Sequence, residues 1–127
     1  MRITDLNDFE ISLRLGKYAK KHNIKLPLAQ KTLYIAFIRF CEKNGQYDET
    51  KGQYFINLSV KEMAREFDAG HTTVINALKA LSDCGAISRI KSSLFKNNET
   101  SGVHNATQAF ITYINVDFLA DEKNNGL

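Results

Sequence analysis

The chain of 127 residues has room for one compact domain. Its composition, 43% hydrophobic and 24% charged with one proline, is that of a soluble globular protein. No apolar run approaches the ~18–20 residues of a membrane span, and the first residues lack the apolar stretch of a secretory signal. We therefore expect a cytoplasmic protein with no membrane partner. The net charge of +3 is too small by itself to indicate a nucleic-acid partner.

Positive charge is concentrated in the first third of the chain. Residues 1–43 contain nine Lys or Arg against four Asp or Glu, whereas residues 97–127 contain one against four. Such a separation is expected if one face of the protein meets phosphate groups and another does not. An ordinary solvated surface accounts for it equally well.

The cysteines and histidines do not form a recognisable site. Cys41 and Cys84 each lie in an apolar helical pattern, so we expect free thiols in a reducing compartment. His22, His71 and His104 share no metal-ligand spacing with them, which argues against a zinc site. The sequence contains no phosphate-binding loop, nucleophile motif or evident catalytic carboxylate pair. We therefore expect neither an enzyme nor a cofactor, and no small-molecule substrate.

Two helices are predicted before Gly45. The first spans residues 8–22, with apolar residues near helical spacing on its predicted inner face: Leu6, Phe9, Leu13 and Tyr18. Its predicted outer face is basic: Arg14, Lys17, Lys20 and Lys21. The second spans residues 28–43 and is apolar over much of its circumference, which predicts a buried position. Gly45 suits its left-handed C-terminal cap.

A short strand precedes the next helix. Residues 46–52 are expected to form a polar loop, and residues 54–58 a strand because they favour β structure. Ser59 and Glu62 have the spacing of a capping box, which predicts a helix over residues 60–67.

A second helix follows a tight turn at residues 68–70. It is predicted over residues 71–84, and Gly85 ends it where a left-handed conformation is required. Its predicted inward residues are apolar and helically spaced: Val74, Ala77, Leu78 and Leu81.

A β-hairpin is predicted after this helix pair. Residues 87–91 and 107–115 alternate in strand fashion, and the polar stretch 92–106 joins them as a long, mobile loop. Residues 116–120 are expected to add a helical turn, and residues 121–127 to form a flexible tail.

Three segments resemble the winged helix-turn-helix family. Residues 58–67 (LSVKEMAREF) resemble its supporting helix, residues 70–81 (GHTTVINALKAL) its recognition helix, and residues 84–87 (CGAI) the exit into the wing. The resemblance spans residues 58–115. With the preceding helices, it implies a single domain over residues 1–120 that is mainly α with a small β-hairpin (α+β): a winged helix-turn-helix with additional N-terminal helices.

The resemblance assigns DNA recognition to the start of the second helix. Small hydroxyls and free amides there suit phosphate oxygens. Farther along, Asn76 is suited to adenine, Ile75 to a thymine methyl and Lys79 to phosphate. The alternative is that Thr72 or Thr73 only caps the helix and Asn76 is only solvated. Because the helix lacks arginine, other phosphate contacts are expected to supply most of the affinity. The predicted double-stranded DNA contacts are Ser59, Gly70, His71, Thr72, Thr73, Ile75, Asn76, Lys79, Arg89, Lys91 and Lys96.

Basic residues outside that helix have two interpretations. Arg89 and Lys91 share one face of the predicted first wing strand, and Lys96 lies in the loop, so these three can track the DNA backbone. A charged strand edge that prevents aggregation explains the pair equally well. The N-terminal segment carries a further group of basic residues: Lys17, Lys20, Lys21 and Lys25. These lysines either contact phosphate or form an ordinary solvated helix face.

The order of elements ahead of the motif resembles the N-terminal domain of RepA-type plasmid replication initiators. That resemblance implies binding to repeated origin DNA, often as a homodimer. Because this chain has no room for the second domain of such initiators, it is interpreted as an isolated domain, an accessory protein of plasmid transfer or a transcriptional regulator. The alternative is a winged helix that binds proteins and not DNA, with Ile75 on the partner surface and the first helix in a dimer interface.

Overall fold

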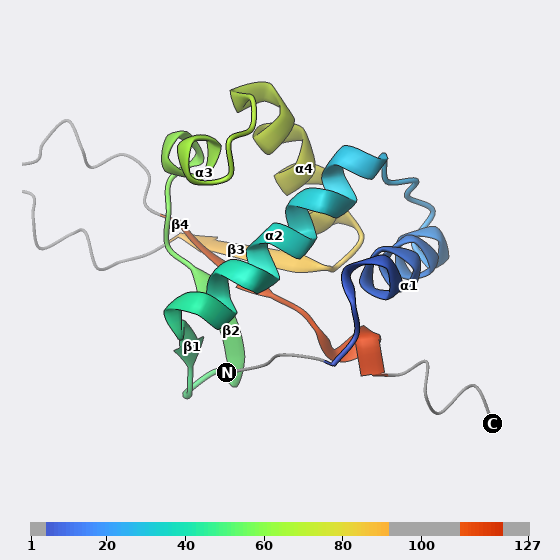
Figure 1. Ribbon diagram of the computed structural model, residues 1–127, viewed down its shortest axis with the longest axis horizontal. Helices are drawn as coiled ribbons and strands as arrows, with labels where there is room; N and C mark the ends of the chain where they lie inside the picture. The colour runs from blue at the N-terminus through green and yellow to red at the C-terminus, as the bar shows by residue number, and fades with distance from the viewer. Residues whose placement is uncertain (1–4, 92–109, 121–127) are drawn as a thin grey trace, which may run out of the picture.

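The computed structural model describes residues 5–91 and 110–120 and shows a mixed α/β fold with a small antiparallel sheet (Figure 1). In chain order the elements are α1 (Asp8–Lys21), α2 (Leu28–Asn44), β1 (Tyr47–Asp48), β2 (Gln53–Ile56), α3 (Val60–Glu66), α4 (His71–Asp83), β3 (Ile87–Lys91) and β4 (Phe110–Ile114). Residues 117–120 add a helical turn, as predicted.

The helix boundaries follow from local hydrogen bonding. The side chain of Asn7 accepts a hydrogen bond from the Glu10 amide and caps α1. At α3 both bonds of the predicted capping box form: the Glu62 amide donates to Ser59 Oγ, and the Ser59 amide donates to the Glu62 carboxylate. Gly45, at φ 61°, ends α2 in the left-handed conformation. All four predicted helices are confirmed to within one residue at each end.

The sheet has the strand order β1-β2-β4-β3, and every pair is antiparallel. The predicted hairpin is confirmed, because Ile87 pairs with Ile114 and Lys91 with Phe110. The second strand ends at Ile114, one residue before its predicted end. Residues 92–109, which include the predicted loop and the start of the predicted strand, lie outside the described part.

The prediction of a plain loop over residues 46–52 was wrong, because a second hairpin begins there. Tyr47 pairs with Tyr54, and their rings lie 4.8 Å apart. The Asp48 carboxylate accepts hydrogen bonds from two amides of the turn and, at 2.9 Å, from the Tyr113 hydroxyl of β4. That hydroxyl lowers the pKa of Asp48. β1 is thus stabilised by its pairing with nearby β2 and by Tyr113, 65 residues from Asp48, a contact that a local pattern does not reveal.

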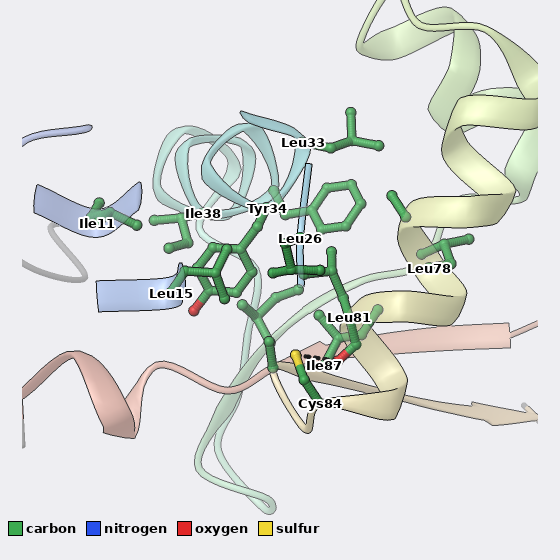
Figure 2. Packing of buried hydrophobic residues seen from close by; sticks show 14 of the residues in the cluster. Ile11, Leu15, Leu26, Leu33, Tyr34, Ile38, Leu78, Leu81, Cys84 and Ile87 are labelled. Atoms are coloured by element: carbon green, nitrogen blue, oxygen red, sulfur yellow. Dashed lines mark hydrogen bonds between the residues drawn. The ribbon is translucent and has the colours of Figure 1, made fainter. Parts of the chain in front are cut away.

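The core lies between the helices and one face of the sheet. That face carries Ile56, Ile87 and Ile114, which join buried residues of α1, α2 and α4 in one cluster. Figure 2 shows Tyr34 of α2 among residues from several of these elements. The buried Tyr34 hydroxyl donates a 2.6 Å hydrogen bond to the Asn115 carbonyl just after β4. The middle of α2 and the end of β4 are therefore joined by a polar contact at the core.

The predicted inner face of α1 was wrong in its main residues. Ile11, Leu15 and Ala19 are buried, whereas Phe9 and Leu13 are 69% and 47% exposed. The two sets lie on opposite sides of the helix, and each has the i, i+4 spacing of an apolar stripe. Helical spacing alone could not choose between them. Packing against α2 buries Ile11, Leu15 and Ala19.

Both cysteines are buried and unpaired, and burial suppresses their reactivity. The Cys41 thiol donates to the Phe55 carbonyl, and burial raises its pKa to about 12. At pH 8 roughly one thiol in ten thousand is then ionised. Burial also raises the pKa of Cys84.

We expect the native protein to react with an aromatic disulfide reagent at pH 8 far more slowly than the protein in urea. Release of the coloured thiolate measures the rate. Leu28→Cys is the positive control, because position 28 is 72% exposed. Rapid modification of the native parent chain would contradict the burial of these thiols.

Candidate nucleic-acid interface

The turn between α3 and α4 places the start of α4 at the surface. Asp68 adopts a positive φ of 52°, and the Ala69 amide returns to the Ala64 carbonyl at 2.9 Å. Gly70 is the N-cap residue of α4, and no side chain caps this end. Neither Thr72 nor Thr73 is therefore the N-cap residue, and the first-turn amides keep the anion-attracting character of a helix N-terminus.

One face of α4 is buried and the other is exposed to solvent. The four residues predicted to point inward are all buried, in agreement with the sequence pattern: Val74, Ala77, Leu78 and Leu81. The solvent face consists of His71, Thr72, Ile75, Asn76, Lys79 and Asp83, and we call it the α4 outer face. Thr73 is only partly exposed. The structure thus brings most of the predicted helix contacts together on one surface.

The α4 outer face has little net positive charge. Lys79 Nζ lies 3.2 Å from the Asp83 carboxylate, one helical turn along. Sequence reasoning missed Asp83, although its i+4 spacing from Lys79 is a recognised signal for an ion pair. In solvent such a pair contributes little to stability. It does, however, place a carboxylate beside the one lysine of this helix.

Ser59 and Arg89 are held by contacts within the fold. Ser59 forms the capping box of α3. Arg89 Nε donates to the buried Thr112 hydroxyl at 3.1 Å, and its guanidinium carbon lies 4.7 Å from the Phe110 ring centre. Partial burial lowers the pKa of Arg89, which remains charged at neutral pH. Arg89 therefore also stabilises the pairing of β3 with β4.

Lys91 and Arg89 alternate with exposed Ser88 and Ile90, so the two basic residues share one strand face. Lys91 is exposed at the end of β3. Lys96 lies outside the described residues.

The N-terminal lysines form a separate basic region. α1 lies at one end of the long axis of the molecule, and the outer ends of β3 and β4 lie at the other (Figure 1). Lys17, Lys20 and Lys21 on α1 are exposed, as is Lys25 after it. The fold therefore does not bring these lysines to the strand that carries Arg89 and Lys91.

Within residues 5–91 and 110–120, no group of three or more His, Cys, Asp and Glu side chains is placed to hold a metal ion. None of the helices described is long and apolar enough to cross a membrane.

Comparison of the chain with protein-family models, curated proteins and solved structures gave no match.

Proposed function

We propose that the chain is a winged-helix protein that binds double-stranded DNA and has no catalytic activity. In this proposal α3 and α4 form the helix-turn-helix, α4 enters the major groove, and β3 with β4 forms the wing. The observation that carries the proposal is the α4 outer face, which presents an uncapped helix N-terminus with His71, Thr72 and Asn76 beside it. The adjacent strand order β2-β4-β3 supports it, since a winged helix also places its last strand in the middle of the sheet.

The proposed setting is the cytoplasm, where the chain would act in replication initiation, transfer or transcriptional control of a plasmid or mobile element. The two buried thiols suit a reducing compartment. Mapping the fragments of host-element DNA that the protein retains tests this assignment. Clustering at a replication origin, a transfer origin or a promoter decides among the three roles, and retention without any clustering contradicts sequence-directed binding.

The charge arrangement predicts an unusual response to two substitutions on α4. Asp83→Asn removes the carboxylate beside Lys79, so we expect tighter binding to duplex DNA. The log–log dependence of affinity on salt should steepen by up to about 0.9, the value of one phosphate contact. Lys79→Ala should weaken binding and make the dependence shallower by a similar amount. Fluorescence anisotropy with a labelled mixed-sequence duplex between 50 and 200 mM salt covers the useful range.

Lys21→Ala on α1 is the matched control, because it removes an exposed lysine that belongs to another helix and not to the α4 outer face. Lys91→Ala tests the proposed wing without breaking the Arg89–Thr112 hydrogen bond. The assignment of α4 fails if Asp83→Asn and Lys79→Ala change the affinity no more than Lys21→Ala does. The DNA-binding proposal fails if the parent chain does not bind duplex even at low salt.

A protein-binding role is the second candidate. Ile75 is 45% exposed in the middle of the α4 outer face, and the adjacent Lys79–Asp83 pair is nearly neutral. An exposed apolar residue among neutral polar groups is a common feature of protein interfaces. Absence of DNA binding, combined with a partner lost on Ile75→Glu, would favour this role.

A further inference from the structure

A small pocket lies between the β1–β2 hairpin and the segment that follows β4. Tyr47 and residues 52–54 line it from the hairpin, and residues 114–117 line it from the end of β4 onward. Its volume is about 330 Å³, at the lower end of the range for ligand sites, so it suits a small ligand. The pairing of β2 with β4 brings its two distant segments together, which is why no local sequence motif marks it.

Two tyrosine rings supply much of the apolar lining of this pocket. The rings of Tyr47 and Tyr54 meet edge to face, with their centres 4.8 Å apart. Tyr54 packs against the hydrophobic core, whereas Tyr47 is 38% exposed. The lining therefore combines a ring that the core holds in place with one that is accessible to a ligand. The face of an aromatic ring is electron-rich and attracts cations.

The lining carries negative charge and no positive charge. Asp117 is exposed and is the one charged residue of the lining, which contains no Lys, Arg or His. Within residues 5–91 and 110–120, the Asp117 carboxylate forms no hydrogen bond or ion pair. Asn115, in contrast, is occupied by the fold, because its side chain donates to the Gly85 carbonyl and accepts from the Asp117 amide. In a protein with a net charge of +3, such a lining selects a cation over an anion.

We propose that this pocket binds a free organic cation with a quaternary ammonium group. Aromatic rings recognise such cations because the ring faces attract the positive charge and contact the methyl groups around it. The Asp117 carboxylate supplies the opposite charge. Primary ammonium ions and metal ions are strongly hydrated, and the lining offers a single carboxylate to replace their water. Binding of the cation does not require DNA binding, since no lining residue belongs to the predicted DNA contacts.

Titration of the isotope-labelled parent chain with choline, followed by amide NMR, tests the pocket. Sodium chloride at equal ionic strength is the blank. We expect saturable shifts confined to the lining segments and a dissociation constant of about 1–10 mM, because so small a ligand makes few contacts. The neutral analogue of choline, in which a tert-butyl group replaces the trimethylammonium group, should bind at least about threefold more weakly. Equal binding of this analogue, shifts spread over other surfaces, or no saturable shift up to about 50 mM choline would overturn the proposal.

Substitutions at Asp117 and Tyr47 test the two features that select the cation. Asp117→Asn should weaken choline binding by about two- to fivefold, as expected for an exposed charge pair. Glu49→Gln is its matched control, because Glu49 is an exposed carboxylate of the same hairpin that does not line the pocket. Tyr47→Leu removes a ring but not the apolar surface, and should weaken binding by about three- to tenfold, whereas Tyr47→Phe should retain it.

Circular dichroism verifies that these variants remain folded. Equal affinities of Asp117→Asn and Glu49→Gln, or of Tyr47→Leu and Tyr47→Phe, would overturn the assignment. A short peptide that carries trimethyllysine is the second probe, because it presents the same ammonium group on a protein chain. Tighter binding of this peptide than of choline would overturn the assignment to a free cation.

Discussion

Phe37→Ala is expected to lower the free energy of unfolding by about 3–5 kcal/mol, the usual cost of removing a buried aromatic ring. Phe37 is completely buried on α2, and its ring centre lies 5.3 Å from that of Phe67, the residue that follows α3. The substitution removes one of the two α2 rings, with Phe40, that pack on Phe67 at the end of α3. We therefore expect it to loosen the α3–α4 pair as well as to lower global stability.

Urea unfolding followed by circular dichroism gives the change in stability. Leu28→Ala, at a position that is 72% exposed, should change it by less than about 0.5 kcal/mol. Amide hydrogen exchange in α3 reports the local effect. Equal midpoints for Phe37→Ala and Leu28→Ala would contradict the packing described for α2.

Gly85→Ala should lower the free energy of unfolding by about 2–4 kcal/mol, because it adds left-handed backbone strain and overpacking. Gly85 connects α4 to β3 at φ 88°, and a Cβ atom there would lie 2.9 Å from the Tyr18 hydroxyl. That ring cannot move away easily, because it stacks on Phe118 with centres 4.2 Å apart.

Gly45→Ala provides the control for backbone strain alone. Gly45 is also left-handed, at φ 61°, but a Cβ atom there meets nothing within 4 Å. Gly45→Ala should lower the free energy of unfolding by about 1–2 kcal/mol. Adding Tyr18→Phe to Gly85→Ala removes the clashing oxygen. The coupling energy from a double-mutant cycle should then account for most of the difference in stability loss between Gly85→Ala and Gly45→Ala. A cycle with no coupling energy would show that the Tyr18 contact is not the cause.

Several local features could be predicted from the sequence because they depend on neighbouring residues. The capping box of Ser59 and Glu62 is confirmed because both of its hydrogen bonds join residues three apart. Gly45 and Gly85 are predictable for a similar reason, since few other residues adopt positive φ at low cost. The inward stripe of α4 is confirmed because four apolar residues share one side of the helix, whereas the opposite side carries mostly polar residues and only Ile75 among its large apolar ones.

The candidate site was only partly predictable. Clustering of Thr72, Ile75 and Asn76 on one surface follows from helical spacing, and so does the neighbouring Lys79–Asp83 pair that the sequence interpretation overlooked. The environment of Arg89 does not follow in this way. Its hydrogen bond to Thr112 spans 23 residues and depends on the register of β3 against β4.

The sequence by itself determined where the helices begin and end and which side of α4 is apolar, because both depend on contacts within a few residues. Tertiary structure decided which side of α1 is buried, because Phe9 with Leu13 and Ile11 with Leu15 have the same spacing and only packing on α2 distinguishes them. It also decided that Tyr47 and Asp48 form a strand, through Tyr54 and the distant Tyr113. Tertiary structure also decided that the basic helix α1 and the outer ends of β3 and β4 lie at opposite ends of the molecule (Figure 1).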